Sequence, residues 1–321
     1  MDLEALLSAR DGEHPSGADL EYDPAFVELN EAARGKEERQ VGDAMEPAEE
    51  PDYADVATKA LAILERSHDL RAAVRWTEAS LRTRGLPGLA DGIAYIVGCL
   101  QRHWATCYPL VDEDDGDPTF RVNTIQELNA DTAMRGLRRA PLTDSRGFGR
   151  FSWRDIQVAE GAITAPEDME TVPDMGAITA AFEDTDPGHI ATLAQAAQAA
   201  KASVDEIGTV FMEETPGFGP ELDELSKTLT RIADVLARHV SEGGGASGDT
   251  EADDQTTEAT AAAAPPGAIR TPQDVANTLD RIIAYYQRNE PSSPVPLLLD
   301  RAKRLVGADF LDIIKDIAPE G

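Results

Sequence analysis

Residues 241–270, SEGGGASGDTEADDQTTEATAAAAPPGAIR, constrain the fold of this chain more than any other stretch. They are almost entirely Gly, Ser, Thr, Asp, Glu, Ala and Pro, and such a composition cannot bury enough apolar surface to offset the entropy lost on folding. We therefore predict a disordered acidic linker between a large N-terminal part and about fifty C-terminal residues. A flexible linker of this kind lets the C-terminal parts of several copies form one symmetric oligomer while their N-terminal parts take different positions around it. The predicted divisions are 1–160, 161–240, 241–270 and 271–321.

The C-terminal residues predict a three-helix unit. Thr271-Pro272 opens its first helix with a cap and a first-position proline, and a proline-rich turn at 291–296 and Gly307 delimit two more short helices. Such a small unit lies near the lower size limit for independent folding and carries more apolar residues than it can bury alone. We infer that it homo-oligomerises, with Arg301 and Arg304 pairing between subunits with Asp309 or Asp312. The residues expected at this interface are Pro294, Pro296, Leu297, Leu298, Leu299, Arg301, Arg304, Leu305, Phe310, Leu311 and Ile314.

Helical periodicity dominates residues 52–108. Apolar residues recur at helical spacing over 56–64, 70–81 and 89–104, and the breaks at 67–69 and 85–88 are short. Three successive helices joined by short turns indicate antiparallel neighbours in a bundle. Further helices are predicted at 26–39 and 123–137, and the acidic run 43–55 is predicted to be a mobile surface loop.

Residues 161–240 predict a helical hairpin. Its arms are 189–213, rich in Ala, and 220–240, with Leu, Ile and Val at helical spacing, whereas 162–188 has no clear period. We expect the two arms of this hairpin to pack against each other or against the hairpin of a second copy of the chain. The fold class is therefore all-α, with an N-terminal helical bundle, a middle helical hairpin, a disordered acidic linker and a small C-terminal three-helix oligomerisation domain.

The charge of the chain disfavours anionic partners. There are 60 acidic and 29 basic residues, a formal net charge of −31. This charge opposes binding to nucleic-acid backbones and to anionic lipid. Cys99 and Cys107, eight positions apart in one predicted helical stretch, do not have the geometry of a disulfide, which favours a reducing compartment. The sequence shows no signal peptide and no window that could span a membrane, so we expect a cytoplasmic protein without direct membrane insertion.

Six arginines form the one basic island in the acidic chain, between 135 and 154. They are interleaved with Phe148, Phe151 and Trp153, a combination that also binds single-stranded nucleic acid. The net charge and the absence of a binding module oppose that interpretation. The two remaining interpretations are pairing with acids of this chain and a surface for an acidic protein partner, since Arg favours bidentate contacts with carboxylates. The residues of the possible partner surface are Arg138, Arg139, Arg146, Arg150 and Arg154.

No motif for catalysis or metal binding is visible in the sequence. There is no phosphate-binding loop, Gly-x-Ser-x-Gly elbow, His-Glu-x-x-His or Cys-x-x-Cys. The acids at 112–117 fail the EF-hand register, which favours a solvated loop over a calcium site. The five histidines are scattered, and we interpret His68 and His103 as helix-surface or capping residues. We expect no enzyme, no cofactor and no metal.

Several segments together resemble the TssA proteins of bacterial type VI secretion systems, which carry an ImpA-type N-terminal domain. The most specific is PSSPVPLLLDRAKRLVGADFLDII near the C-terminus. The N-terminal half contributes HPSGADLEYDPAF at 14–26, Asp69-Leu70-Arg71, GLPGLADG at 85–92, the tryptophan before Tyr108-Pro109, and the stretch from APLT to SWRDI at 140–156. The resemblance covers roughly 10–160 and 271–321 and leaves the middle region and the linker unmatched.

This resemblance implies a structural assembly protein. The C-terminal domain would form a ring that engages the baseplate, the contractile sheath and the inner tube. The short chain resembles the baseplate-associated branch of the family, with a distal-end sheath cap as the alternative. A different class of function is a monomeric acidic adaptor that docks on a partner through its C-terminal helices.

Overall fold

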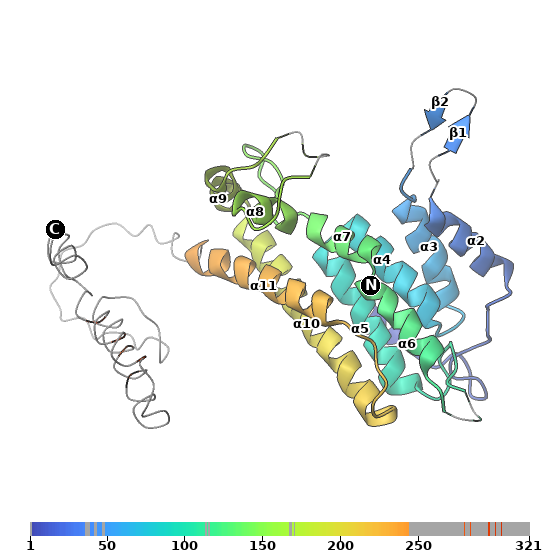
Figure 1. The fold of residues 1–321 in the computed structure, drawn as a ribbon. Helices are drawn as coiled ribbons and strands as arrows, with labels where there is room; N and C mark the ends of the chain where they lie inside the picture. The colour runs from blue at the N-terminus through green and yellow to red at the C-terminus, as the bar shows by residue number, and fades with distance from the viewer. Residues whose placement is uncertain are drawn as a thin grey trace, which may run out of the picture. The chain divides into compact units, whose positions relative to one another are not determined.

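The structure is a computed structural model that divides into two units, Met1–Gly248 and Asp249–Gly321. It describes residues 2–243 except 36–38, 42–43, 47–48, 113, 115, 167–168 and 170, and beyond them the single positions 279, 283, 295, 299 and 303. The first unit is a helical bundle (Figure 1). Its helices are α1 (Leu3–Leu6), α2 (Pro24–Arg34), α3 (Tyr53–Leu64), α4 (Leu70–Arg84), α5 (Leu86–His103), α6 (Thr119–Gln126), the 3-10 helix η1 (Glu127–Asn129), α7 (Asp131–Arg139), α8 (Trp153–Ala159), α9 (Met175–Asp184), α10 (Pro187–Glu214) and α11 (Asp223–Gly243).

The three central helices α3, α4 and α5 confirm the predicted antiparallel block. Asp52 caps α3 and Asp69 caps α4, each through a side-chain oxygen that accepts backbone N–H groups of the first turn. The joint between α4 and α5 is a single residue, Gly85, at φ 68°. A side chain is disfavoured at that φ, so glycine permits the sharp reversal. The predicted turn at 85–88 is thus shorter than expected, because Pro87 is accommodated in the first turn of α5.

Two predicted segments near the N-terminus are wrong in detail. The helix predicted for 26–39 ends at Arg34. An antiparallel hairpin follows, with β1 (Arg39–Val41) just before the acidic region that was expected to be a loop, 43–55, and β2 (Ala44–Glu46) inside it. Gly35, at φ 65°, ends α2 and redirects the chain. The hairpin contains the only strands in the described part of the chain, which remains a mostly helical fold.

Two further helices differ from their predictions. The helix expected at 123–137 is split into α6, η1 and α7, because Ala130 adopts an extended conformation between them. The stretch after Gly161, in which no period was found, contains α9. Asp174 caps α9, and its buried face consists of only three residues, too few to produce a clear periodic signal: Ile178, Ala181 and Phe182.

The hairpin of α10 and α11 shares one hydrophobic core with the N-terminal bundle. α10 packs along both α11 and α5, and buried residues of all three helices belong to a single apolar cluster. Small buried side chains such as Ala197 and Ala200 allow α10 to lie close to its neighbours. A boundary near residue 160, predicted from the change in sequence character, is therefore not a boundary between compact units.

Most of the predicted C-terminal unit lies outside the described residues. The five described positions, Leu279, Ile283, Val295, Leu299 and Lys303, are all helical. They fall within two of the three predicted helices. Ile283 is buried, as its place in the predicted apolar stripe requires.

Candidate functional site

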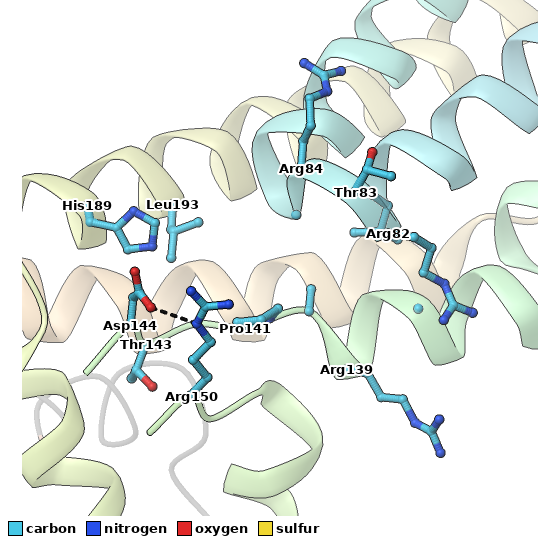
Figure 2. Close-up of a pocket in the computed structure, with 14 residues that line it drawn as sticks. Arg82, Thr83, Arg84, Arg139, Pro141, Thr143, Asp144, Arg150, His189 and Leu193 are labelled. Atoms are coloured by element: carbon cyan, nitrogen blue, oxygen red, sulfur yellow. Dashed lines mark hydrogen bonds and ion pairs between the residues drawn. The ribbon is translucent and has the colours of Figure 1, made fainter. Parts of the chain in front are cut away.

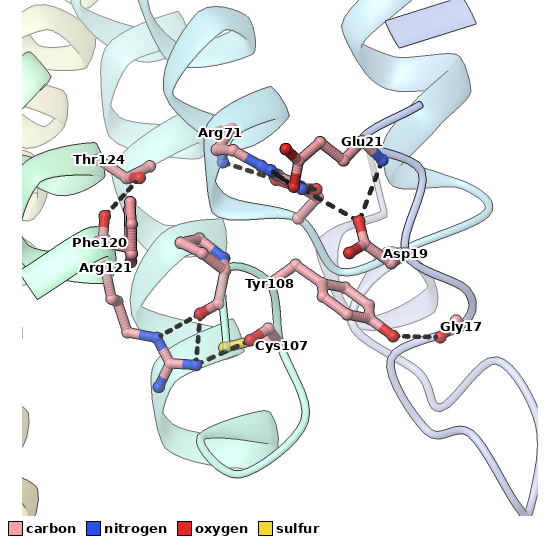
Figure 3. Close-up of polar contacts among 11 residues, drawn as sticks. Gly17, Asp19, Glu21, Arg71, Cys107, Tyr108, Phe120, Arg121 and Thr124 are labelled. Atoms are coloured by element: carbon pink, nitrogen blue, oxygen red, sulfur yellow. Dashed lines mark hydrogen bonds and ion pairs between the residues drawn. The ribbon is translucent and has the colours of Figure 1, made fainter. Parts of the chain in front are cut away.

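Segments far apart in the sequence meet in a network of backbone pairs within the first unit. Gly17 pairs with Ser67, and Asp69 pairs with Tyr108, each as an isolated β-bridge. The hydroxyl of Tyr108 donates a hydrogen bond to the carbonyl oxygen of Gly17 at 3.3 Å, which closes the network (Figure 3). The N-terminal segment is thus fixed to the start of α4 and to the loop after α5.

Arg71 holds the same region together by ion pairs. Its guanidinium contacts Asp69 at 2.7 Å, Glu21 at 2.8 Å and Asp19 at 3.2 Å (Figure 3). Burial opposes the charge, but the hydrogen bonds that Arg71 donates to Asp69 and its contact with Glu21 keep the pKa of Arg71 above its ordinary value. Lysine at this position could not keep all three contacts, because the planar guanidinium group of Arg71 presents several N–H donors and an ammonium group does not have that geometry.

His68 and His103 are core residues, so their interpretation as helix-surface or capping residues is wrong. The exposed fraction is 0% for His68 and 8% for His103. Nε2 of His68 lies 3.1 Å from the carbonyl oxygen of Ser8, and Nδ1 lies 3.0 Å from the hydroxyl of Tyr95. The carbonyl can only accept, so Nε2 carries the proton and Nδ1 accepts from Tyr95. Burial, then Arg10 and His103, lower the pKa of His68 to about 4.

Arg121 is a fully buried cation that sequence reasoning missed. Its guanidinium donates hydrogen bonds to the carbonyl oxygens of Trp104, Cys107 and Pro109, at 2.9, 2.7 and 2.8 Å. Figure 3 shows the bond to Cys107. It also lies 4.5 Å from the centre of the Trp104 ring. These contacts fix the loop after α5. Arg121 lies in none of the motifs that carried the resemblance, so no local signal in the sequence marked it.

These interior groups stabilise the fold and do not form a reactive site. The thiols of Cys99 and Cys107 are free and buried, and burial raises the pKa of both, that of Cys107 to about 11. Neither supplies a thiolate at neutral pH. Across the described positions, no three His, Cys, Asp or Glu side chains are placed to hold a metal ion. None of the helices described is long and apolar enough to cross a bilayer.

The surface contains one pocket with a concentration of basic residues, which we call the arginine pocket. Its volume is about 420 Å³, and it opens where α4 and α7 end, each with two arginines in the last turn. Cations are favoured there because the helix macrodipole leaves partial negative charge at a C-terminus. The first turn of α10 and the loop 140–150 complete the walls (Figure 2). The arginines that line the pocket are Arg82, Arg84, Arg139 and Arg150.

The structure brings together only two of the five arginines predicted as a partner surface, Arg139 and Arg150, in this pocket. Arg138 forms an ion pair with Glu224 of α11. Hydrogen bonds from Ser145 and Gly147 lower the pKa of Asp184, and Arg146 lowers it further. Arg154 lies in α8. The other two members of the pocket, Arg82 and Arg84, come from α4, more than fifty residues earlier in the chain.

The predicted oligomerisation residues are mostly outside the described part of the chain. Leu299 is described, is helical and is half-buried. Nothing is described for Pro294, Pro296, Leu297, Leu298, Arg301, Arg304, Leu305, Phe310, Leu311 and Ile314.

Comparison with known proteins agrees with this architecture. The family model described as ImpA, N-terminal, type VI secretion system, matches residues 8–130. The type VI secretion system component TssA1 of Pseudomonas aeruginosa is 37% identical over 333 aligned positions, covering 100% of this chain and 96% of that protein. The chain belongs to the TssA family. Among solved structures, the N-terminal domain including the conserved ImpA_N region of the TssA component from Burkholderia cenocepacia matches with a TM-score of 0.61 and 26% identity. That match covers 76% of this chain and 95% of the solved domain.

The family relationship places the interior network within the shared TssA fold. The matched residues 8–130 contain Gly17, His68, Arg71, Tyr108 and Arg121. Gly17, Arg71 and Tyr108 belong to motifs that carried the resemblance in the sequence, whereas His68 and Arg121 lie outside those motifs. The arginine pocket straddles the end of this match, since Arg82 and Arg84 lie inside it and Arg139 and Arg150 lie beyond it.

Proposed function

We propose that this TssA-family chain is a structural assembly component that forms a ring-like homo-oligomer through residues 271–321. The ring would bind the baseplate of a type VI secretion system and coordinate assembly of the contractile sheath and inner tube on the cytoplasmic side. The observation that carries this proposal is the full-length relationship to a TssA1 component, which includes the C-terminal residues as well as the N-terminal domain.

The division of the chain supports assembly through the C-terminus. The first unit contains its own continuous hydrophobic core, so it does not need a partner to bury apolar surface. The second unit is small, and units of about this size commonly require oligomerisation, a metal or disulfides to be stable. Both cysteines and all five histidines of the chain lie in the first unit, so we propose association, not a disulfide or a Cys/His metal site, as the source of stability.

The relationship to a secretion-system component argues against an enzyme. The interior contacts are consistent with this view, because the buried side chains of His68, His103 and Arg121 each bind backbone carbonyl oxygens and so fix a loop or a helix. We propose that the protein acts by binding other proteins and has no catalytic role. Residence at the baseplate is proposed in preference to the distal end of the sheath.

The substitution Leu298→Asp tests the proposed interface. A carboxylate at the centre of an apolar interface is costly to bury, so the oligomer should dissociate while the first unit stays folded. Leu298→Met, which conserves volume and polarity, is the matched control and should retain the oligomer. Sedimentation velocity measures the assembly and tryptophan fluorescence reports on the first unit. A Leu298→Asp protein with the sedimentation coefficient of the wild type contradicts this interface, and a wild-type monomer favours the adaptor alternative.

A further inference from the structure

The arginine pocket concentrates positive charge on a chain whose net charge is −31. Four arginines line it, and Asp144 is its only acidic lining residue. One cation at each C-terminus would be enough to stabilise the two helices that end there. The helix macrodipoles therefore do not by themselves explain why four arginines lie at this pocket. The loop 140–150 adds Arg150 from outside any helix.

The positions of the guanidinium groups determine which ligand they suit. Arg150 lies beside Asp144 and His189 at one end of the pocket, Arg82 and Arg139 lie at the other end, and Arg84 points in a third direction (Figure 2). A single small anion can contact only one or two groups that are spread in this way. An extended segment with several carboxylates can contact them in succession, each arginine as a planar fork.

The present partners of Arg84 and Arg150 can be exchanged. Arg150 contacts Asp144 at 2.7 Å, Arg84 contacts Asp91 at 2.7 Å, and Arg82 contacts Glu50 at 3.2 Å. The carboxylates of all three pairs are solvent-exposed to a third or more. Arg84 and Arg150 are themselves 41% and 67% exposed, and exposed ion pairs contribute little to stability, so a carboxylate from another molecule can replace Asp91 or Asp144 at low cost. Arg82 is only 14% exposed and keeps Glu50 as its partner.

The pocket also offers apolar contacts. Pro141 is an exposed part of its lining, and the aromatic ring of Phe148 is exposed in the same loop as Arg150. A peptide that carries apolar residues between its acids would bury this surface, whereas a nucleic-acid backbone or free phosphate would not. The net charge of the chain further disfavours a polyanion of high charge density.

We propose that the arginine pocket binds an acidic peptide segment of a partner protein, one that carries several carboxylates interspersed with apolar side chains. Arg84 and Arg150 bind the carboxylates, and Phe148 with Pro141 contacts the apolar residues. This binding does not require the C-terminal ring, so its failure and the failure of the proposed oligomer are distinguishable.

Fluorescence anisotropy of the full chain tests this proposal. The probe is a fluorescein-labelled dodecapeptide in which pairs of glutamates alternate with glycine and leucine, and a glutamine version is the uncharged control. The double substitution Arg84→Ala and Arg150→Ala should weaken binding about tenfold at low salt. Arg102→Ala is the matched control, because Arg102 forms the same kind of exposed pair with Glu4 at the other end of α5, roughly 25 Å away. It should leave binding unchanged.

A second variant should strengthen binding, which loss of folding cannot imitate. Asp144→Asn removes the carboxylate that occupies Arg150, so the affinity for the acidic peptide should rise two- to threefold. The proposal is overturned if wild-type protein does not distinguish the glutamate peptide from the glutamine peptide. It is also overturned if Arg102→Ala weakens binding as much as the double variant, or if equimolar inorganic phosphate or a single-stranded oligonucleotide displaces the peptide.

Discussion

The rings of His68 and His103 stack in the core of the first unit, with their centroids 4.2 Å apart and their planes 19° from parallel. Nε2 of His103 lies 2.9 Å from the carbonyl oxygen of Leu7, and Nε2 of His68 contacts that of Ser8. The pair thus fixes the end of α1 and the residues that follow it to α4 and α5. Two imidazoles in contact within a core are stable only while at least one is neutral, because like charges at this distance repel.

We predict that the first unit loses stability as the pH falls from 6.5 toward 4. The pKa of His68 is lowered from 6.5 to about 4 on folding, so the unfolded chain binds a proton in this window that the folded chain does not. Stability therefore rises with pH and falls on acidification, by about 2 kcal/mol between pH 7 and pH 5. Urea unfolding followed by tryptophan fluorescence measures this, since Trp76, Trp104 and Trp153 all lie in the first unit.

The substitution His68→Gln is the control for this pH dependence. Glutamine keeps a hydrogen-bonding side chain but cannot titrate. The free energy of unfolding of the variant should therefore change less with pH between 6.5 and 5 than that of the wild type, even if the variant is less stable at pH 7. Carboxylates titrate mostly at lower pH and are the same in both proteins. Equal slopes for the wild type and the variant would show that His68 does not carry the effect.

Gly17 should be intolerant of a side chain. A Cβ atom there would lie 2.1 Å from the carbonyl oxygen of Arg66, and the φ of 77° is itself unfavourable for alanine. Gly17→Ala is expected to cost about 2–4 kcal/mol in the free energy of unfolding. Gly12→Ala, in the same segment but with no atom within 4 Å of the added Cβ, should change stability by about 0.5 kcal/mol or less. Similar costs at the two positions would refute the close packing of the segment.

Arg121→Met should destabilise the first unit by about 3 kcal/mol or more. Methionine fills the volume but leaves the carbonyl oxygens of Trp104, Cys107 and Pro109 buried without their donor. Arg75→Met is the comparison, because Arg75 is partly exposed and makes one ion pair with Glu127 at 3.1 Å. It should cost about 1 kcal/mol or less in urea unfolding.

Ala200→Leu tests whether α10 belongs to the same core as α5. Ala200 is fully buried, so three added carbons must displace neighbours, at a cost of about 1–3 kcal/mol. Ala199→Leu, one position earlier and exposed, should be nearly neutral. If both substitutions are tolerated equally, as measured by thermal unfolding, α10 is not packed against the bundle in solution.

Local signals in the sequence were sufficient for the long helices. The apolar spacing over 56–64, 70–81 and 89–104 and the short breaks between these stretches located α3, α4 and α5. Short elements were missed where few residues carry the pattern, as in α9 and the β1–β2 hairpin. The joint core of α5 and α10 could not be deduced, since the alanine-rich face of α10 fits several partners equally well.

The polar residues show the same limit. His68 follows the end of one helix and precedes the cap of the next, a position typical of an exposed turn, and only the fold encloses it with Ser8 and Tyr95. The arginine island between 135 and 154 was visible in the sequence as a cluster. Its regrouping with Arg82 and Arg84 depends on α4 and α7 ending at the same place, which local patterns do not encode.

Sedimentation velocity of the full chain, beside a variant that ends at Gly248, tests the central claim most directly. Truncation after Gly248 lies beyond the end of α11 and removes no residue of the first unit. We predict one large discrete assembly for the full chain and a monomer for the shortened variant, whose tryptophan fluorescence should be unchanged. Monomers in both samples, or an assembly that survives removal of residues 249–321, would contradict a ring formed by the C-terminal unit.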